Sequence, residues 1–238
     1  MSPSFAPEVA GEIFVLRPDY CALSLVALGV DNAATPCVQG ARSDAQEWLR
    51  NSPPPWQEAH FEAWRAAYRA FGAKPQRTPP SAEALRKRMD STGQLPSVNA
   101  AVDLYNAISV RYALPVGGEN IAAYDGRPRL VRASGDESFD TIKEGAAHIE
   151  HVPAGEVIWR DERGATCRRW NWRQGVRTRI DQATQEMWFV LERLEPMPVA
   201  ALLEAGRELA AAIAQLSPAA RLSSALIDQS GFRTPPRR

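Results

Sequence analysis

The sequence predicts an α+β fold in which a mixed, mainly antiparallel sheet is flanked by helices. Three observations carry this prediction: β-rich runs open the chain, helix-forming segments follow, and short β-like runs alternate with Gly, Asp and Pro turns after Pro115. A chain of 238 residues is long enough to bury a full hydrophobic core.

The N-terminal part predicts two strands followed by helices. Two short apolar runs within residues 11–33 are rich in β-branched and aromatic side chains, which is typical of strands. Ser43 suits the N-cap of a short helix that ends near Arg50. Apolar side chains recur at helical spacing over residues 56–71, and Gly72 suits the C-terminal end of that helix.

Three further helices are predicted from caps, charges and periodicity. Ser81 begins a helix whose first turn is acidic and whose last turn is basic, as the helix dipole favours. Ser97 begins the next helix, and residues 198–216 form a long amphipathic one. We expect residues 1–220 to form a single domain and residues 221–238 to be a loose C-terminal tail.

Composition excludes several classes of protein. Lys and Arg together number 28, as do Asp and Glu, and this balance argues against indiscriminate nucleic-acid binding, so we expect no DNA partner. The three cysteines lack metal-binding spacing, and we expect neither a metal nor a cofactor. The most apolar run, residues 21–30, is about half the ~20 residues of a membrane span, and no signal peptide is recognisable. We therefore expect a cytoplasmic protein without membrane contact.

A stretch rich in arginine and tryptophan, CRRWNWRQGVRTRID at residues 167–181, is the first candidate site. If it is a strand, one face carries Arg169, Asn171 and Arg173, and the other carries Trp170 and Trp172. Such an arginine row binds a carboxylate, a phosphate or a ribose edge. Two alternatives stay open: the indoles stack on a base, or the arginines pair with internal carboxylates such as Asp103 or Glu119.

A polar row on the helix after Ser97 is the second candidate. Asn99, Asp103 and Asn106 are spaced at i, i+4 and i+7 and share one side of that helix. Polar rows on facing elements form a cleft more readily than a core. We therefore expect the helix row and the arginine row to line one cavity.

A basic cluster between Arg65 and Arg88 is either a solvated helical face or a surface that binds phosphates. Its candidate RNA-binding residues are Arg69, Lys74, Arg77, Arg86 and Lys87. The motif HIEH offers His148 and His151, but further metal ligands are not evident, so we expect loop histidines. His60 is expected to be a surface or packing residue.

Three segments between Phe71 and Glu192 match a known pattern: FGAKPQRTPPSAEALRKRM, LPSVNAAVDLYNAISVRYALPVGGEN and GEVIWRDERGATCRRWNWRQGVRTRIDQATQEMWFVLE. They resemble the free-standing B3/B4-domain proteins. In the β subunit of phenylalanyl-tRNA synthetase the same domain carries the editing site. The resemblance implies a B3/B4-type α+β module that hydrolyses an amino acid wrongly esterified to tRNA, and a partner that is the acceptor end of tRNA.

The resemblance also implies site residues. The synthetase pattern P-x-N-x-x-V-D-x-T-N and the proline of its P-L-H-A-F-D segment are matched by Asn99, Val102, Asp103, Asn106 and Pro115. Glu192 matches a glutamate that senses the misplaced side chain. Tyr105 replaces a threonine, Gly117 replaces a histidine, and RWNWR replaces a glycine-rich wall, so tyrosine is not the expected substrate.

The expected activity is that of a trans-acting aminoacyl-tRNA deacylase. Orientation of the ester and donors to the oxyanion can suffice for an activated ester, and the candidate donors are Asn106, Gly117 and Gly118. The candidate substrate-binding residues are Asn99, Tyr105, Glu119, Arg169, Asn171, Arg173 and Glu192. A non-catalytic RNA-binding module and a pocket for a free amino acid or similar small anion are the alternatives.

Overall fold

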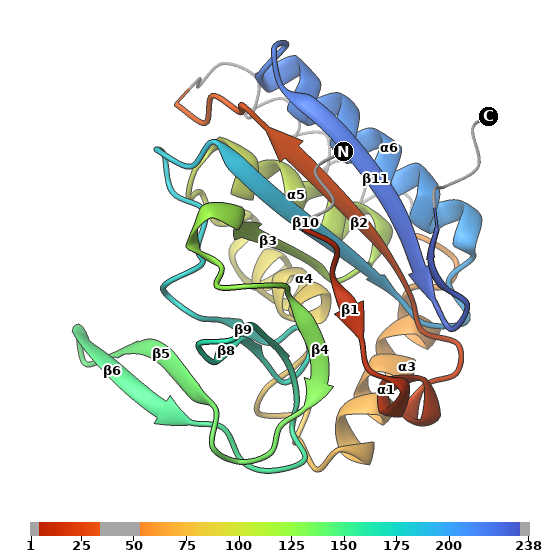
Figure 1. The fold of residues 1–238 in the computed structure, drawn as a ribbon. Coiled ribbons are helices and arrows are strands. Elements are labelled where there is room, and N and C mark those ends of the chain that lie inside the picture. Colours follow the sequence, from red (N-terminus) through yellow and green to blue (C-terminus); the bar gives the residue numbers. More distant parts are fainter. Residues whose placement is uncertain (1–4, 34–52, 234–238) are drawn as a thin grey trace.

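The computed structural model describes residues 5–33 and 53–233 and has the α+β fold that the sequence predicts (Figure 1). Within these residues, five α-helices accompany two sheets. The helix predicted from Ser43 to Arg50 lies outside the described residues.

The five-stranded sheet is antiparallel throughout, in the order β12-β11-β2-β10-β3. Its central strands are apolar on both faces because each face is covered by another layer. The strands are β2 (Cys21–Leu28), β3 (Val116–Asn120), β10 (Glu186–Arg193), β11 (Arg221–Asp228) and β12 (Gly231–Arg233).

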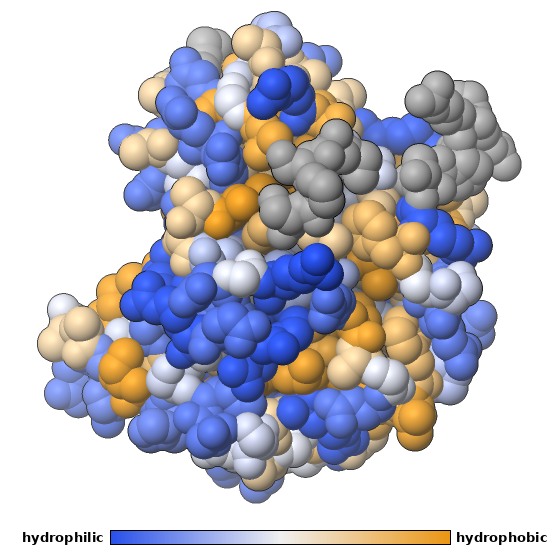
Figure 2. Space-filling view, in the orientation of Figure 1, coloured by the Kyte–Doolittle hydropathy of each residue, from blue (hydrophilic) through white to orange (hydrophobic). Residues whose placement is uncertain are grey.

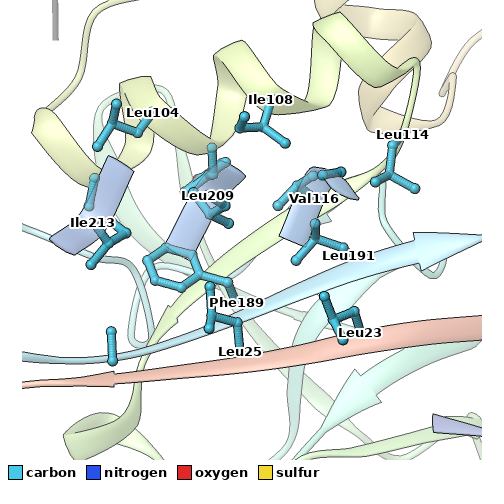
Figure 3. Close-up of a cluster of buried hydrophobic side chains, with 14 of the residues drawn as sticks. Leu23, Leu25, Leu104, Ile108, Leu114, Val116, Phe189, Leu191, Leu209 and Ile213 are labelled. Atoms are coloured by element: carbon cyan, nitrogen blue, oxygen red, sulfur yellow. The ribbon is translucent and has the colours of Figure 1, made fainter. Parts of the chain in front are cut away.

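Helices α5 (Ala100–Tyr112) and α6 (Val199–Leu216) cover one face of this sheet, and the main hydrophobic core lies between them and β2 and β10 (Figure 3). Gly206 lets α6 approach β2 closely, because a Cβ at this position would lie 1.9 Å from a methyl of Leu23. This close packing holds α6, and α5 beside it, at a defined height above the sheet.

The second sheet has the order β1-β4-β7-β8-β5-β6, with β9 paired to β8. The β1–β4 and β5–β8 pairs are parallel and the others antiparallel. A short 3-10 helix, η1 (Ile121–Ala123), leads from the first sheet to it. The strands are β1 (Glu8–Val9), β4 (Arg129–Arg132), β5 (Ser138–Lys143), β6 (Ala146–His151), β7 (Val157–Arg160), β8 (Ala165–Arg168) and β9 (Arg173–Gln174).

A second core, rich in aromatic residues, joins the two sheets to helix α3 (Gln57–Ala70). Trp64 of α3, Trp170 of the β8–β9 connection and Trp188 of β10 are each no more than 1% exposed. The Trp64 and Trp170 rings meet edge to face with centroids 5.2 Å apart, a favoured aromatic geometry. Helix α4 (Ser81–Thr92) then packs on α5.

Two sequence expectations are wrong. The first apolar run forms the short helix α1 (Gly11–Leu16) instead of a strand, because its single buried side chain, Ile13, is covered by the aromatic core without strand pairing. Residues 221–233 are not a loose tail, since β11 pairs with β2 along its length. The two serines within RLSSALID weaken its apolar pattern, so pairing to a buried neighbour decided its structure.

Candidate functional site

A cavity of about 330 Å³, here called the central cavity, lies between α4 and α5 on one side and β3, β10 and the β8–β9 connection on the other. Its size is at the lower end of the range of small-molecule sites. Its polar lining residues are Ser81, Arg88, Tyr105, Asn106, Asn171, Arg173, Gln174 and Glu192, and indoles, aliphatic side chains, Gly117 and Gly118 supply much of the rest.

Glu192 of β10 is the most buried charged residue in the lining, at 1% exposure. Its Oε1 accepts hydrogen bonds from the Tyr20 hydroxyl at 2.8 Å, the Trp170 indole at 3.0 Å and the Trp159 indole at 3.2 Å. Its Oε2 accepts one from the Asn171 amide at 3.2 Å. Four neutral donors from three segments of the chain therefore converge on one carboxyl group, and Oε2 has room for a further donor.

Burial raises the pKa of Glu192 to about 7, although the four hydrogen bonds oppose that shift by favouring the ionised form. Glu119 of β3 is also buried, and burial raises the pKa of its carboxyl to about 8. At neutral pH both groups are therefore partly protonated. A ligand cation or donor beside Glu192 would stabilise its ionised form.

This shift has a consequence for stability. An unfolded glutamate has a pKa near 4.5, so between pH 4.5 and 7 the folded protein holds the Glu192 proton more tightly than the unfolded chain does. Raising the pH through this window removes stability, and the loss ends above the folded-state pKa. We predict that the wild type loses stability relative to Glu192→Gln as the pH rises from ~5 to ~7, and that the difference between their unfolding free energies is constant at higher pH. Urea unfolding of both proteins measures this difference.

Glu119→Gln is the matched control. The difference in unfolding free energy between this variant and the wild type should continue to change until the pH reaches the Glu119 pKa of about 8. A Glu192→Gln difference that stays constant over the whole window would show that the folded-state pKa of Glu192 is not raised.

The arginine–tryptophan stretch is not the continuous strand that its alternation predicts. It forms a turn between β8 and β9, with positive φ at Arg169 (48°) and Trp170 (67°). Left-handed backbone at two successive residues with side chains is strained, and persists where surrounding contacts over-determine it. Both indoles line the central cavity: Trp170 is fully buried and donates to Glu192, whereas Trp172 is only partly buried and packs against the aromatic core.

The turn also separates the arginines. Arg168 is buried in a bidentate pair with Glu156, at 2.9 Å for both bonds. Arg169 stacks over the Trp172 ring, with 4.3 Å from its guanidinium carbon to the ring centroid, and does not line the central cavity. Arg173 does line it, and also donates to the Thr141 hydroxyl at 2.5 Å. Ion pairing with internal carboxylates therefore occurs, and the recorded partners of the arginines in this stretch are Glu156, Glu150 and Asp161.

Of the polar row predicted on helix α5, only Asn106 lines the central cavity. Asn99 is the N-cap, accepting from the Val102 N–H at 3.1 Å, and its amide donates to the Ile180 carbonyl. Asp103 accepts from the Ser97 hydroxyl and the Val98 N–H. Neither lines the central cavity. These two residues hold the start of the helix, as is typical of Asn and Asp there.

Tyr105 and Asn106, one turn further along α5, line the central cavity. No hydrogen bond is recorded for the Asn106 amide or the Tyr105 hydroxyl within the described residues. The Tyr105 ring lies directly against Gly118, where a Cβ would come within 2.6 Å of it. A glycine at this position of β3 is therefore what allows Tyr105 to occupy the place of a smaller side chain.

The two glycines of β3 differ in what their amides do. Pro115 accepts from the Glu192 N–H, which makes Pro115 and Glu192 a hydrogen-bonded pair of the antiparallel ladder. Hydrogen-bonded pairs alternate, so Gly117 and Val190 are the next such pair, and the Gly117 N–H is used in the ladder. The Gly118 N–H points to the other edge of β3. The Gly118 carbonyl on that edge accepts from Gln174 at 2.7 Å.

Glu119 does not line the central cavity. Its Oε2 accepts from the Gln174 amide at 2.7 Å, so it anchors a residue that does line the cavity. Gln174 and Arg88 were not singled out from the sequence. Arg88 shares a helical face with Ser81, Ala84 and Leu85 at i, i+3, i+4 and i+7, and this spacing was the signal that could have identified it.

The predicted basic cluster contains more ion pairs than its sequence indicates. Arg69 pairs with Glu62, Arg86 with Asp90 and Lys87 with Glu83. The two others, Lys74 and Arg77, are exposed, and no ion pair is recorded for either within residues 5–33 and 53–233. These two cations line a second cavity, apart from the first.

The histidines and the central-cavity thiol do not form a metal or nucleophile site. His148 and His151 lie on strand β6 and are exposed, instead of lying in a loop. His60 is fully buried, and burial lowers its pKa to about 4. Burial, with the charges of Glu119 and Glu192, raises the pKa of the Cys167 thiol well above its usual value, so it is protonated at neutral pH.

No group of three or more His, Cys, Asp or Glu side chains in the described residues is placed to hold a metal ion. No helix in those residues combines the length and apolar character needed to cross a bilayer.

Comparison with known proteins identifies the family. A model of the B3/4 domain matches residues 63–206, more than half of the chain. The fold is similar to an N-terminal fragment of the phenylalanyl-tRNA synthetase β subunit from Pyrococcus horikoshii, with a TM-score of 0.51 at 9% identity. The match covers 98% of this chain and 55% of the fragment, so the chain spans about half the length of that fragment. No curated protein sequence matches. The chain belongs to the B3/4-domain family.

Proposed function

We propose that this protein is a trans-acting deacylase that hydrolyses an amino acid wrongly esterified to tRNA. The observation that supports it best is the meeting of Asn106, Gly118 and Glu192, from three different elements, in one cavity of amino-acid size. The B3/4-domain family and the fold of a tRNA synthetase β-subunit fragment agree with a tRNA substrate.

Hydrolysis of an aminoacyl ester requires few catalytic groups, because the ester is already activated. A water oxygen bonds to the carbonyl carbon, the bond to the ribose oxygen breaks, and one proton passes from the water to that oxygen. The negative charge that develops on the carbonyl oxygen needs nearby donors. Asn106 offers an amide without a recorded partner, and Gly118 an N–H outside the β3–β10 ladder. The protonated Cys167 is not the nucleophile.

The lining of the central cavity suggests how the acyl group is held. Trp159, Trp170 and Val190 provide an apolar wall, and Glu192 lies behind them with one oxygen able to accept another hydrogen bond. We assign to Glu192, and not to the enclosed Glu119, contact with the ammonium group or another donor of the amino acid. Ionised Glu192 would be favoured by that contact.

The opening of the central cavity carries two cations. Arg88 of α4 is exposed, and its guanidinium has no ion pair recorded within the described residues, while Arg173 of β9 is 35% exposed and lies 3.9 Å from a carboxylate oxygen of Glu150. A guanidinium pairs well with a phosphate oxygen. We assign to these two arginines the ribose–phosphate end of the acylated nucleotide.

A panel of mischarged tRNAs incubated with the protein tests the proposal. We expect faster ester loss from at least one member, and a 10- to 100-fold lower kcat/KM in Arg88→Ala/Arg173→Ala, because about two charge-assisted contacts are lost. Lys143→Ala/Arg207→Ala removes two exposed cations from β5 and α6 and should change kcat/KM little. No accelerated ester loss across the panel would argue against the enzyme, and tRNA binding without turnover would identify a non-catalytic module.

A pocket for a free amino acid is the second candidate, favoured by opposite charges at the two ends of the central cavity. Arg88 and Arg173 suit a carboxylate, and Glu192 suits an ammonium group. A thermal-shift screen separates the two functions, since a free amino acid would raise Tm where deacylated tRNA does not.

A further inference from the structure

The second cavity, here called the basic cavity, has a volume of about 540 Å³ and lies on the far side of the β8–β9 turn from the central cavity. The end of α3 and the loop that follows it form one side, and the loop before β7 forms the other. The residues that matter for its chemistry are Phe71, Lys74, Arg77, Thr78, Glu156 and Arg169.

Positive charge dominates this lining. Three cations, Lys74, Arg77 and Arg169, meet a single carboxylate, that of Glu156. Both oxygens of this carboxylate are engaged by Arg168 at 2.9 Å. Arg169 also pairs with Glu156, at 3.5 Å, so Lys74 and Arg77 are the two lining cations without a recorded ion pair within residues 5–33 and 53–233.

The neighbouring helical surface differs in this respect. Its cations Arg69, Arg86 and Lys87 each have a carboxylate partner. Exposed ion pairs are weak and do not prevent binding of an anion, but they cancel the local field. Among the basic residues of α3, α4 and their connection that the structure describes, Lys74 and Arg77 at the basic cavity and Arg88 at the central cavity have no recorded ion pair. Figure 2 shows hydrophilic residues gathered on the front face over β4, β8 and β9.

One side-chain stack connects the two cavities. Arg169 lines the basic cavity and lies over the Trp172 ring at 4.3 Å, and Trp172 lines the central cavity. Positive φ at Arg169 and Trp170 produces this arrangement, because it turns the chain so that neighbouring residues face different cavities. A ligand that extends from one cavity to the other passes along this stack.

We infer that the basic cavity binds phosphodiester groups of the RNA strand whose acylated end occupies the central cavity. This inference rests on the proposed function for the identity of the RNA. Lys74 and Arg77 supply charge to the phosphate oxygens, and Arg169 supplies a planar fork of donors held in place by Trp172.

Binding of a deacylated RNA hairpin that mimics a tRNA acceptor stem tests the inference without requiring catalysis. We expect Lys74→Glu/Arg77→Glu to weaken binding by about 10- to 100-fold and to reduce the slope of log affinity against log salt by about 2, one for each phosphate contact. Lys143→Glu/Arg207→Glu makes the same change in net charge on β5 and α6 and should weaken binding by less than about 3-fold. Lys74→Gln/Arg77→Gln, which introduces no repulsion, serves if the glutamate variant does not fold.

The outcomes separate this inference from the proposed function. Equal affinities and salt slopes for the wild type and the Lys74/Arg77 variants would overturn the inference, whatever the mischarged tRNA panel shows. Loss of hairpin binding in those variants supports it even if no ester is hydrolysed. Binding of adenosine 5′-monophosphate but not of the hairpin, abolished in the same variants, would overturn the RNA assignment in favour of a free nucleotide.

Discussion

Replacing Glu192 with alanine is expected to lower the free energy of unfolding by about 3–5 kcal/mol, because four donors lose their acceptor at once. The donors come from Tyr20 before β2, Trp159 of β7, and the consecutive residues Trp170 and Asn171 of the β8–β9 turn. Each unsatisfied buried donor costs about 1–3 kcal/mol, and water entering from the central cavity can satisfy only some of them. Urea unfolding measures the loss.

Glu192→Gln is the comparison that isolates the cause. Its side-chain oxygen can still accept from Tyr20 and the two indoles, while its amide faces the Asn171 amide as a second donor. We expect it to lose less than half of what the alanine variant loses. An alanine variant as stable as the wild type would mean that the carboxyl does not hold the Trp170 turn in place.

Replacing Asn106 with alanine is expected to lower kcat for a responsive mischarged tRNA by about 10²- to 10³-fold, the usual effect of removing one donor to an oxyanion. Its amide lines the central cavity without a recorded protein partner, so its loss should leave the unfolding free energy changed by less than about 1 kcal/mol. Single-turnover deacylation, measured together with urea unfolding, separates the two effects.

Asn99→Ala is the matched control on the same helix. Asn99 caps α5 and does not line the central cavity, so its replacement should cost about 1 kcal/mol of stability and leave kcat within a few-fold of the wild type. If Asn106→Ala and Asn99→Ala have equal effects on kcat, Asn106 is not a donor in the reaction, and the geometry around Gly118 must be reconsidered.

These two predictions test different properties of one cavity. Glu192 is a buried acceptor whose removal should appear in stability first, since protein donors depend on it. Asn106 is a free amide whose removal should appear in rate. The proposed function requires both residues, because a cavity without a polar group available to the substrate would be only a packing void in the core.

Much of the fold was predictable from local pattern. The helical periodicity of residues 56–71 and 198–216 corresponds to α3 and α6, since an amphipathic helix carries its own signal. The strand β11 and the short helix α1 were not predictable in this way. Their structures depend on which neighbouring element covers them, and a sequence of only six to eight residues contains little information about that neighbour.

The site shows the same division. By itself the sequence determined the α+β class, the family resemblance and the candidates Asn106, Gly118, Arg173 and Glu192, which do line one cavity. Only the tertiary structure decided that the arginine–tryptophan stretch turns at Arg169, and that the turn makes two cavities instead of one row. The physical reason is that periodicity reports which residues share a face of one element, whereas a cavity and its ion pairs are made between elements. Glu192 and Trp170 meet although 22 residues separate them, and no local pattern encodes that contact.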